Sequence, residues 1–177
     1  MVDTQLIELE GRNRLIESIL SAGLDVALPI RDDGVDLIVY RRKGEDVFNA
    51  RPLQLKTATK PRFTVDRIKY EGRHGLIMAY VWGQDRSTIY ALSYHPDVSD
   101  VARAMGWDQT NAWQTGAGTK RPGWSCYASS KLLRVLEPFQ ATPDRWRALL
   151  EPGAENVAAA LSQPAASCVA AHSSPKL

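Results

Sequence analysis

Two short apolar runs in the first third of the chain are each interrupted by polar residues. The first covers 35–40 (VDLIVY) and the second covers 52–56 (PLQLK), with a polar connection between them. Successive side chains of a strand face opposite sides of a sheet, so Gln54 and Lys56 share one face. The pattern predicts two paired strands in which Asp36, Gln54 and Lys56 converge.

The rest of the first half predicts one helix and several further strands. Apolar residues at helical spacing predict a helix over 4–22. Partial alternation predicts a strand over 24–30, and a shorter one follows at 62–66. The strongest strand signals are the aromatic and β-branched runs 76–82 and 88–94, which predict a hairpin at the centre of the sheet.

The second half is mostly helical in pattern. A helix is predicted to open at 95–97 and to run to about residue 105, and further helices follow Ser130 and Thr142. Between them, the glycine-rich segment 107–125 predicts a mobile loop. The predicted fold class is therefore α/β, with a central mixed β-sheet flanked by helices and with helices at its C-terminal end.

Length and composition indicate one domain and a tail. The chain has 177 residues and is 44% hydrophobic, which suits a single domain over 1–151. Residues 152–177 are rich in alanine, serine and proline and predict a mobile tail. The two cysteines, Cys126 and Cys168, are too far apart to indicate a disulfide framework or a cysteine metal site. Without a signal peptide or an apolar stretch of ~18 residues, a cytoplasmic protein with no membrane contact is expected.

Charge is unevenly distributed along the chain. The formal net charge is only +2. Residues 1–50 hold six Lys/Arg against ten Asp/Glu, whereas residues 51–74 hold seven against two. An acidic pocket beside a basic strip is what a metal-dependent enzyme acting on a polyanion needs, although a solvated charged surface would give the same counts.

The chemistry of the converging residues suits a hard cation. A carboxylate, an amide oxygen and an ammonium group on one sheet face can hold an ion such as Mg²⁺ through the oxygens. The lysine would then lie near a phosphate or an attacking water. The residues alone therefore favour phosphate chemistry at Asp36, Gln54 and Lys56.

The order of Asp36 on one strand and Gln54-x-Lys56 on the next resembles the PD-(D/E)XK, or restriction-endonuclease-like, nucleases. It is similar to the Gln-x-Lys variant found in some homing endonucleases and resolvase relatives. The helix over 4–22 and the strand over 24–30 precede these strands in the order that the family uses. The full chain also resembles uncharacterised bacterial proteins of this type.

The resemblance implies a restriction-endonuclease-like core and metal-assisted hydrolysis of phosphodiesters. The catalytic residues that it implies are Asp36, Gln54, Lys56 and a helical glutamate, for which Glu8 is the candidate. It also implies that Mg²⁺ or Mn²⁺ is held by Asp36, the Gln54 side-chain oxygen, the Leu55 carbonyl and Glu8. Lys56 would orient the attacking water and offset charge on the phosphate.

Two positions depart from the family pattern. Val35 stands where the family has proline, which is not a ligand, and Gln54 replaces an acid. An amide oxygen can coordinate a metal but brings no charge, so another carboxylate is needed. Glu8 lies nearer than Glu17 to the apolar stripe of its helix and is preferred, while Glu10 stays open.

Two groups of basic residues are predicted to contact a nucleic-acid backbone. They are Lys60, Arg62, Lys120 and Arg121. The first two follow the candidate catalytic lysine, where a neighbouring phosphate would lie. The other two lie in the 107–125 segment, whose Trp113 or Trp124 could stack on a base.

The predicted function is a metal-dependent, endonuclease-like phosphodiesterase acting on nucleic acid, DNA before RNA. One alternative is a nucleic-acid-binding or interaction domain that keeps the fold and has lost the chemistry. Another is a structural reading in which Asp36 and Lys56 form a partly buried ion pair capped by Gln54. A homodimer is a further option for the assembly.

Overall fold

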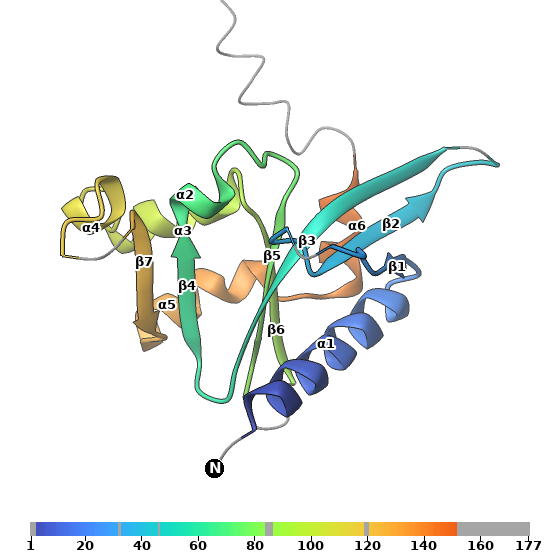
Figure 1. The fold of residues 1–177 in the computed structure, drawn as a ribbon, viewed down its shortest axis with the longest axis horizontal. Helices are drawn as coiled ribbons and strands as arrows, with labels where there is room; N and C mark the ends of the chain where they lie inside the picture. The colour runs from blue at the N-terminus through green and yellow to red at the C-terminus, as the bar shows by residue number, and fades with distance from the viewer. Residues whose placement is uncertain (1–2, 32, 46, 84–86, 119–120, 152–177) are drawn as a thin grey trace, which may run out of the picture.

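The computed structural model describes residues 3–31, 33–45, 47–83, 87–118 and 121–151. A five-stranded mixed sheet lies at its centre, with helices on both faces (Figure 1). The predicted α/β class with a mixed sheet flanked by helices is confirmed. The predicted tail over 152–177 lies outside the described residues.

The strands of the central sheet are β1 (Asp25–Ala27), β2 (Leu37–Arg42), β3 (Phe48–Ala58), β5 (Ile77–Trp82) and β6 (Thr88–Ser93). Their order is β1-β2-β3-β5-β6, and only the β3–β5 pair is parallel. The predicted β5–β6 hairpin is confirmed, but its predicted place at the centre of the sheet is wrong. The long strand β3 is central instead, because β5 pairs with it after a crossover and leaves β6 at the edge.

One face of the sheet is covered by α1 (Thr4–Ser21) and α6 (Pro143–Leu150). Leu15 and Ile19 of α1 and Trp146 of α6 are fully buried there against leucines of β3. Asp3 caps α1 through its carboxylate, which explains why the helix begins where the sequence predicts. No helix among the described residues is long and apolar enough to cross a membrane.

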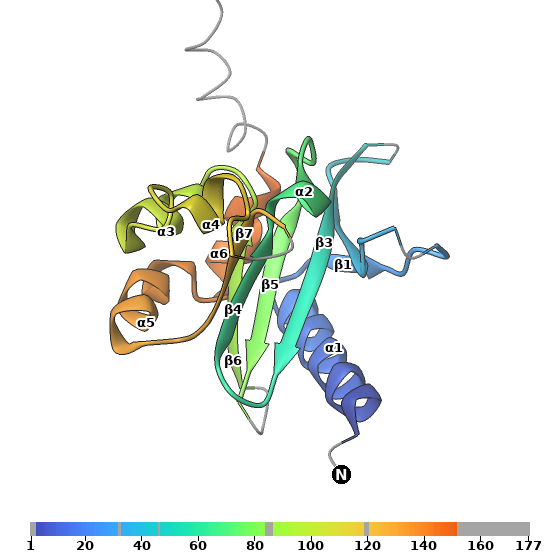
Figure 2. The ribbon, with the colours of Figure 1, turned by 60° about the vertical axis from the view of Figure 1, so that its left-hand side comes forward.

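The opposite face carries a second layer of smaller elements. They are β4 (Arg62–Asp66), α2 (Arg67–Tyr70), α3 (Asp97–Met105), α4 (Asn111–Gln114), β7 (Gly123–Tyr127), α5 (Ser130–Leu136) and a 3₁₀ turn (Glu137–Phe139). Figure 2 shows this layer on one side of the sheet and α1 on the other. Phe63 and Leu132 of this layer are fully buried in one hydrophobic cluster with Tyr80 of β5.

The segment 107–125 differs most from its prediction as a loop. It contains α4 and β7, and β7 pairs antiparallel with β4 from Arg62↔Tyr127 to Asp66↔Gly123. The early strand predicted over 24–30 is also shorter in the structure, where only β1 is formed.

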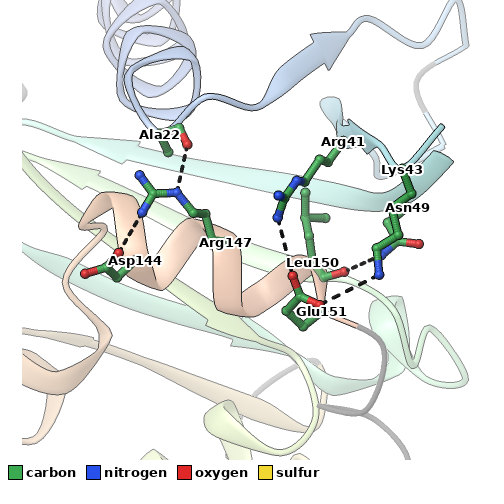
Figure 3. Close-up of polar contacts among 8 residues, drawn as sticks. All are labelled: Ala22, Arg41, Lys43, Asn49, Asp144, Arg147, Leu150 and Glu151. Carbon is green, nitrogen blue, oxygen red and sulfur yellow. Dashed lines mark hydrogen bonds and ion pairs between the residues drawn. The ribbon is translucent and has the colours of Figure 1, made fainter.

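Residues in and next to helix α6 form hydrogen bonds and an ion pair with parts of the chain that are distant in sequence (Figure 3). Arg147 Nε donates to the carbonyl of Ala22 at the end of α1 (3.2 Å). Asn49 of β3 donates to the carbonyl of Leu150 (3.0 Å), and Arg41 of β2 pairs with Glu151 (3.4 Å). The last described helix therefore fixes both α1 and the β2–β3 pair.

Gly11 sets how closely α1 approaches the sheet. A Cβ at this position would lie 2.2 Å from Cγ2 of Thr57 on β3. We expect Gly11→Ala to lower the free energy of unfolding by about 1–3 kcal/mol, because this contact forces α1 away from β3. Urea denaturation of Gly11→Ala and of Gly11→Ala/Thr57→Ser tests this, since serine lacks that methyl group. A double variant as unstable as the single one contradicts the explanation.

Candidate active site

The three residues singled out in the sequence lie on one face of the sheet. Leu37 of β2 pairs with Leu53 of β3, so Asp36, one residue earlier, lies beside Gln54. Gln54 and Lys56 alternate with leucines that face α1, and both project toward the second layer. The predicted convergence of these side chains is therefore present in the fold.

The Asp36 carboxylate occupies the place where β2 begins and backbone pairing with β3 stops. Its own N–H donates to the carbonyl of Leu53 (2.8 Å). Its Oδ2 accepts a hydrogen bond from the N–H of Leu55 (2.6 Å) and another from Nε2 of Gln54. The Asp36 carboxylate thus accepts the N–H of Leu55 where the backbone of β2 offers no acceptor. Two donors to the same oxygen hold this side chain in place.

The Gln54 side chain is buried, with 5% of its surface exposed. Its Nε2 also approaches the Leu55 carbonyl (3.2 Å). Its Oε1, in contrast, is buried and has no hydrogen-bond partner among the described residues. A buried amide oxygen without a partner is costly, so this atom marks a place where a ligand would be stabilising.

Lys56 is half-buried beside this group. Burial lowers the pKa of its ammonium, and the nearby charge of Lys69 lowers it further, while Asp36 and Asp66 act in the opposite direction. Within the described part of the chain Lys56 forms no hydrogen bond or ion pair, and its Nζ lies 5.8 Å from the centre of the Tyr70 ring. The structural alternative, an Asp36–Lys56 ion pair, is therefore not formed.

Helix α2 and the turn after it bring further groups to the site. Lys69 Nζ lies 5.5 Å from the centre of the Tyr70 ring. Arg73 donates from Nη1 to the carbonyl of Asp33 (2.6 Å), which fixes the loop leading to Asp36. The excess of basic residues over 51–74 indicated a cationic strip, but a four-residue helix has no periodicity that places individual side chains.

Tyr70 itself is fully buried next to these charges. Its hydroxyl is buried and has no hydrogen-bond partner among the residues that the structure describes. Burial, followed by the carboxylates of Asp36 and Asp66, raises the pKa of this hydroxyl. The Tyr70 hydroxyl therefore stays neutral and can donate a hydrogen bond. Together with Oε1 of Gln54, it is one of two buried polar atoms near the site that have no hydrogen-bond partner among the described residues.

The helical glutamate is not part of this cluster. Glu8 is exposed on α1 and pairs with Arg12 (2.8 Å). Gly11, one turn along the same helix, packs against Thr57, whose side chain faces away from Lys56. Among the described residues there is no group of three or more His, Cys, Asp or Glu side chains arranged around a metal position. The role of Glu8 or Glu10 stays a prediction.

The residues predicted to bind a nucleic-acid backbone lie at different distances from the cluster. Arg121 is exposed and pairs with Asp66 (3.2 Å), whose charge acts on Lys56. Arg62 is exposed at the other end of β4, about 13 Å from Asp66 at ~3.3 Å per residue, and Lys60 is exposed just before this strand. Lys120 lies outside the described residues.

The two tryptophans considered for base stacking belong to the core of the second layer. Trp113 has 8% of its surface exposed, and the Arg67 guanidinium lies 5.5 Å from its ring centre. Trp124 stacks on Trp107 at a centroid distance of 5.1 Å. Trp113 is thus buried in this core, whereas Trp124 is only partly buried against it, and a role of either ring in base stacking stays a prediction.

The donor set fits a hard divalent cation. Asp36 offers a carboxylate, the Leu55 carbonyl lies within reach of the Gln54 amide, and Gln54 holds an unpartnered oxygen. Rotating the Gln54 amide by half a turn would exchange its nitrogen for that oxygen beside Asp36. The two protein oxygens added to the carboxylate are neutral, so such a site is weakly charged and depends on a phosphate to complete it.

No protein-family model matches the chain, and comparisons with curated proteins and with solved structures give no match.

Proposed function

We propose that this chain is a metal-dependent phosphodiesterase of the restriction-endonuclease-like type that acts on nucleic acid, DNA before RNA. The observation that supports this most is the meeting of Asp36, the Gln54 amide, the Leu55 carbonyl and the Lys56 ammonium at the start of β2. A carboxylate, two neutral oxygens and an unpaired cation at one point form a set suited to phosphate hydrolysis.

In this proposal Asp36, Leu55 and Gln54 would hold Mg²⁺ or Mn²⁺ through their oxygens. When bound, the ion would act as a Lewis acid and would lower the pKa of a coordinated water. Asp36 is kept in place by the Leu55 N–H, so its carboxylate needs little reorganisation.

Lys56 would provide the positive charge that the phosphate requires. Its Nζ donates to a phosphate oxygen and offsets charge that grows in the transition state. The half-buried position that lowers its pKa also excludes water that would screen this charge. Because the ammonium forms no hydrogen bond or ion pair with the described residues, no such bond to them must break before it binds substrate.

A second candidate function is a nucleic-acid-binding domain without catalysis. It is favoured by the single carboxylate of the cluster and by the direct Gln54–Asp36 hydrogen bond, which satisfies the carboxylate without a metal. This candidate predicts DNA affinity that falls with salt and no metal-dependent cleavage.

A cleavage assay with the purified chain separates the two functions. We expect nicking of supercoiled plasmid and cutting of linear duplex DNA in Mg²⁺ or Mn²⁺, weaker action on RNA, and none in EDTA. The same preparations are tested for DNA binding in EDTA by fluorescence anisotropy. Binding without cleavage in either metal would replace the enzymatic proposal by the binding domain.

A further inference from the structure

We propose that Lys69 is a second phosphate-binding residue, and that the site grips a phosphodiester between the ammonium groups of Lys56 and Lys69. This inference rests on the proposed function and extends it from the β3 residues to helix α2. It assigns to α2 the task of holding the backbone of the substrate.

Lys69 is held close to the cluster by its surroundings. Its Nζ and that of Lys56 lie 5.5 and 5.8 Å from the centre of one ring, that of Tyr70. Its Cε also lies 3.0 Å from the position of a Cβ on Gly34, two residues before Asp36. Gly34 has a φ of 70°, so glycine is favoured there for its backbone as well as for this contact.

Neither ammonium group is within ion-pair distance of a carboxylate of the described residues. Among the described residues neither Lys56 nor Lys69 forms an ion pair, although Lys69 lies close enough for its charge to act on Lys56. The two like charges repel each other, and the more distant carboxylates of Asp36 and Asp66 offset this repulsion only in part, because the pKa of Lys56 is still lowered. An anion with several oxygens, such as a phosphodiester, would satisfy both.

Lys69 is also the more exposed member of this pair and the one that a large substrate meets first. Its side chain is exposed, whereas Lys56 is half-buried. Each ammonium lies near the Tyr70 ring, and an aromatic ring orients a cation without competing for its hydrogen bonds. The contact is to the backbone of the nucleic acid and is independent of its sequence.

The test compares Lys69→Met with Lys69→Arg and with Lys131→Met, a matched exposed lysine on α5. Binding of a labelled DNA duplex is measured in EDTA over a series of salt concentrations. We expect Lys69→Met to reduce the slope of log K against log salt by about 1, equally for unrelated sequences, and the other two variants to keep it. Cleavage by Lys69→Met should show a higher KM and a lower kcat.

The outcomes separate this inference from the proposed function. A Lys69→Met slope equal to that of the wild type overturns the role of Lys69, even if the wild type cleaves DNA. A reduced slope in a protein that never cleaves DNA supports the role of Lys69 and removes the enzymatic proposal. Equal melting temperatures of the variants exclude unfolding as the cause.

Discussion

Replacing Lys56 by methionine is expected to abolish metal-dependent cleavage, with a loss of about 10³-fold in kcat. The ammonium is the half-buried positive charge beside Asp36, and removing a preorganised charge of this kind costs several kcal/mol in the transition state. Single-turnover cleavage of a labelled duplex measures the loss. Cleavage by purified Lys56→Met at the wild-type rate would defeat the assignment of this residue.

The same variant should fold at least as well as the wild type. The pKa of Lys56 is lower in the folded chain than in the unfolded chain, so the charged form opposes folding. Methionine removes that penalty fully at neutral pH, and the gain disappears as the pH rises through the usual lysine pKa of 10.5. A melting temperature equal to or above that of the wild type therefore separates lost chemistry from lost structure.

Asp36→Asn is expected to remove both metal binding and cleavage, the latter by about 10³-fold. The substitution removes the one carboxylate that the described residues bring to the cluster, while an amide oxygen can still accept the hydrogen bond from Leu55. Calorimetric titration with Mn²⁺ should show a site in the wild type and none in Asp36→Asn.

Asp33→Asn is the matched control for this experiment. Its carboxylate lies on the same loop but is 91% exposed and pairs with Arg73. Cleavage by Asp33→Asn should stay close to that of the wild type, because exposed ion pairs contribute little. Wild-type Mn²⁺ binding by Asp36→Asn would remove Asp36 from the metal site.

The centre of the site was predictable because its signal is local. The two-residue period of a strand puts Gln54 and Lys56 on one face, and pairing of neighbouring strands brings Asp36 beside them. Helix α1 was predictable for the same reason, since its cap and apolar stripe lie within one segment.

The surroundings of the site were not predictable, because they depend on contacts between distant segments. Lys69 lies in the crossover of β4 and α2 that links β3 to β5, and only the path of this crossover brings it to Gly34. The pairing of β4 with β7 joins Phe63 to Cys126, and no pattern within either strand specifies that partner. Trp124 packs against the core for a similar reason, since only the fold brings Trp107 against it.

The position of α6 has a consequence for biosynthesis. Trp146 fills the layer beneath α1, and its Nε1 donates to Ser18 Oγ (2.9 Å), a residue made 128 positions earlier. While the chain emerges from the ribosome, α1 and the sheet can meet, but the space for this indole stays open until α6 has also emerged. The N-terminal layer therefore closes late, and a nascent chain halted before α6 exposes apolar surface that chaperones would recognise.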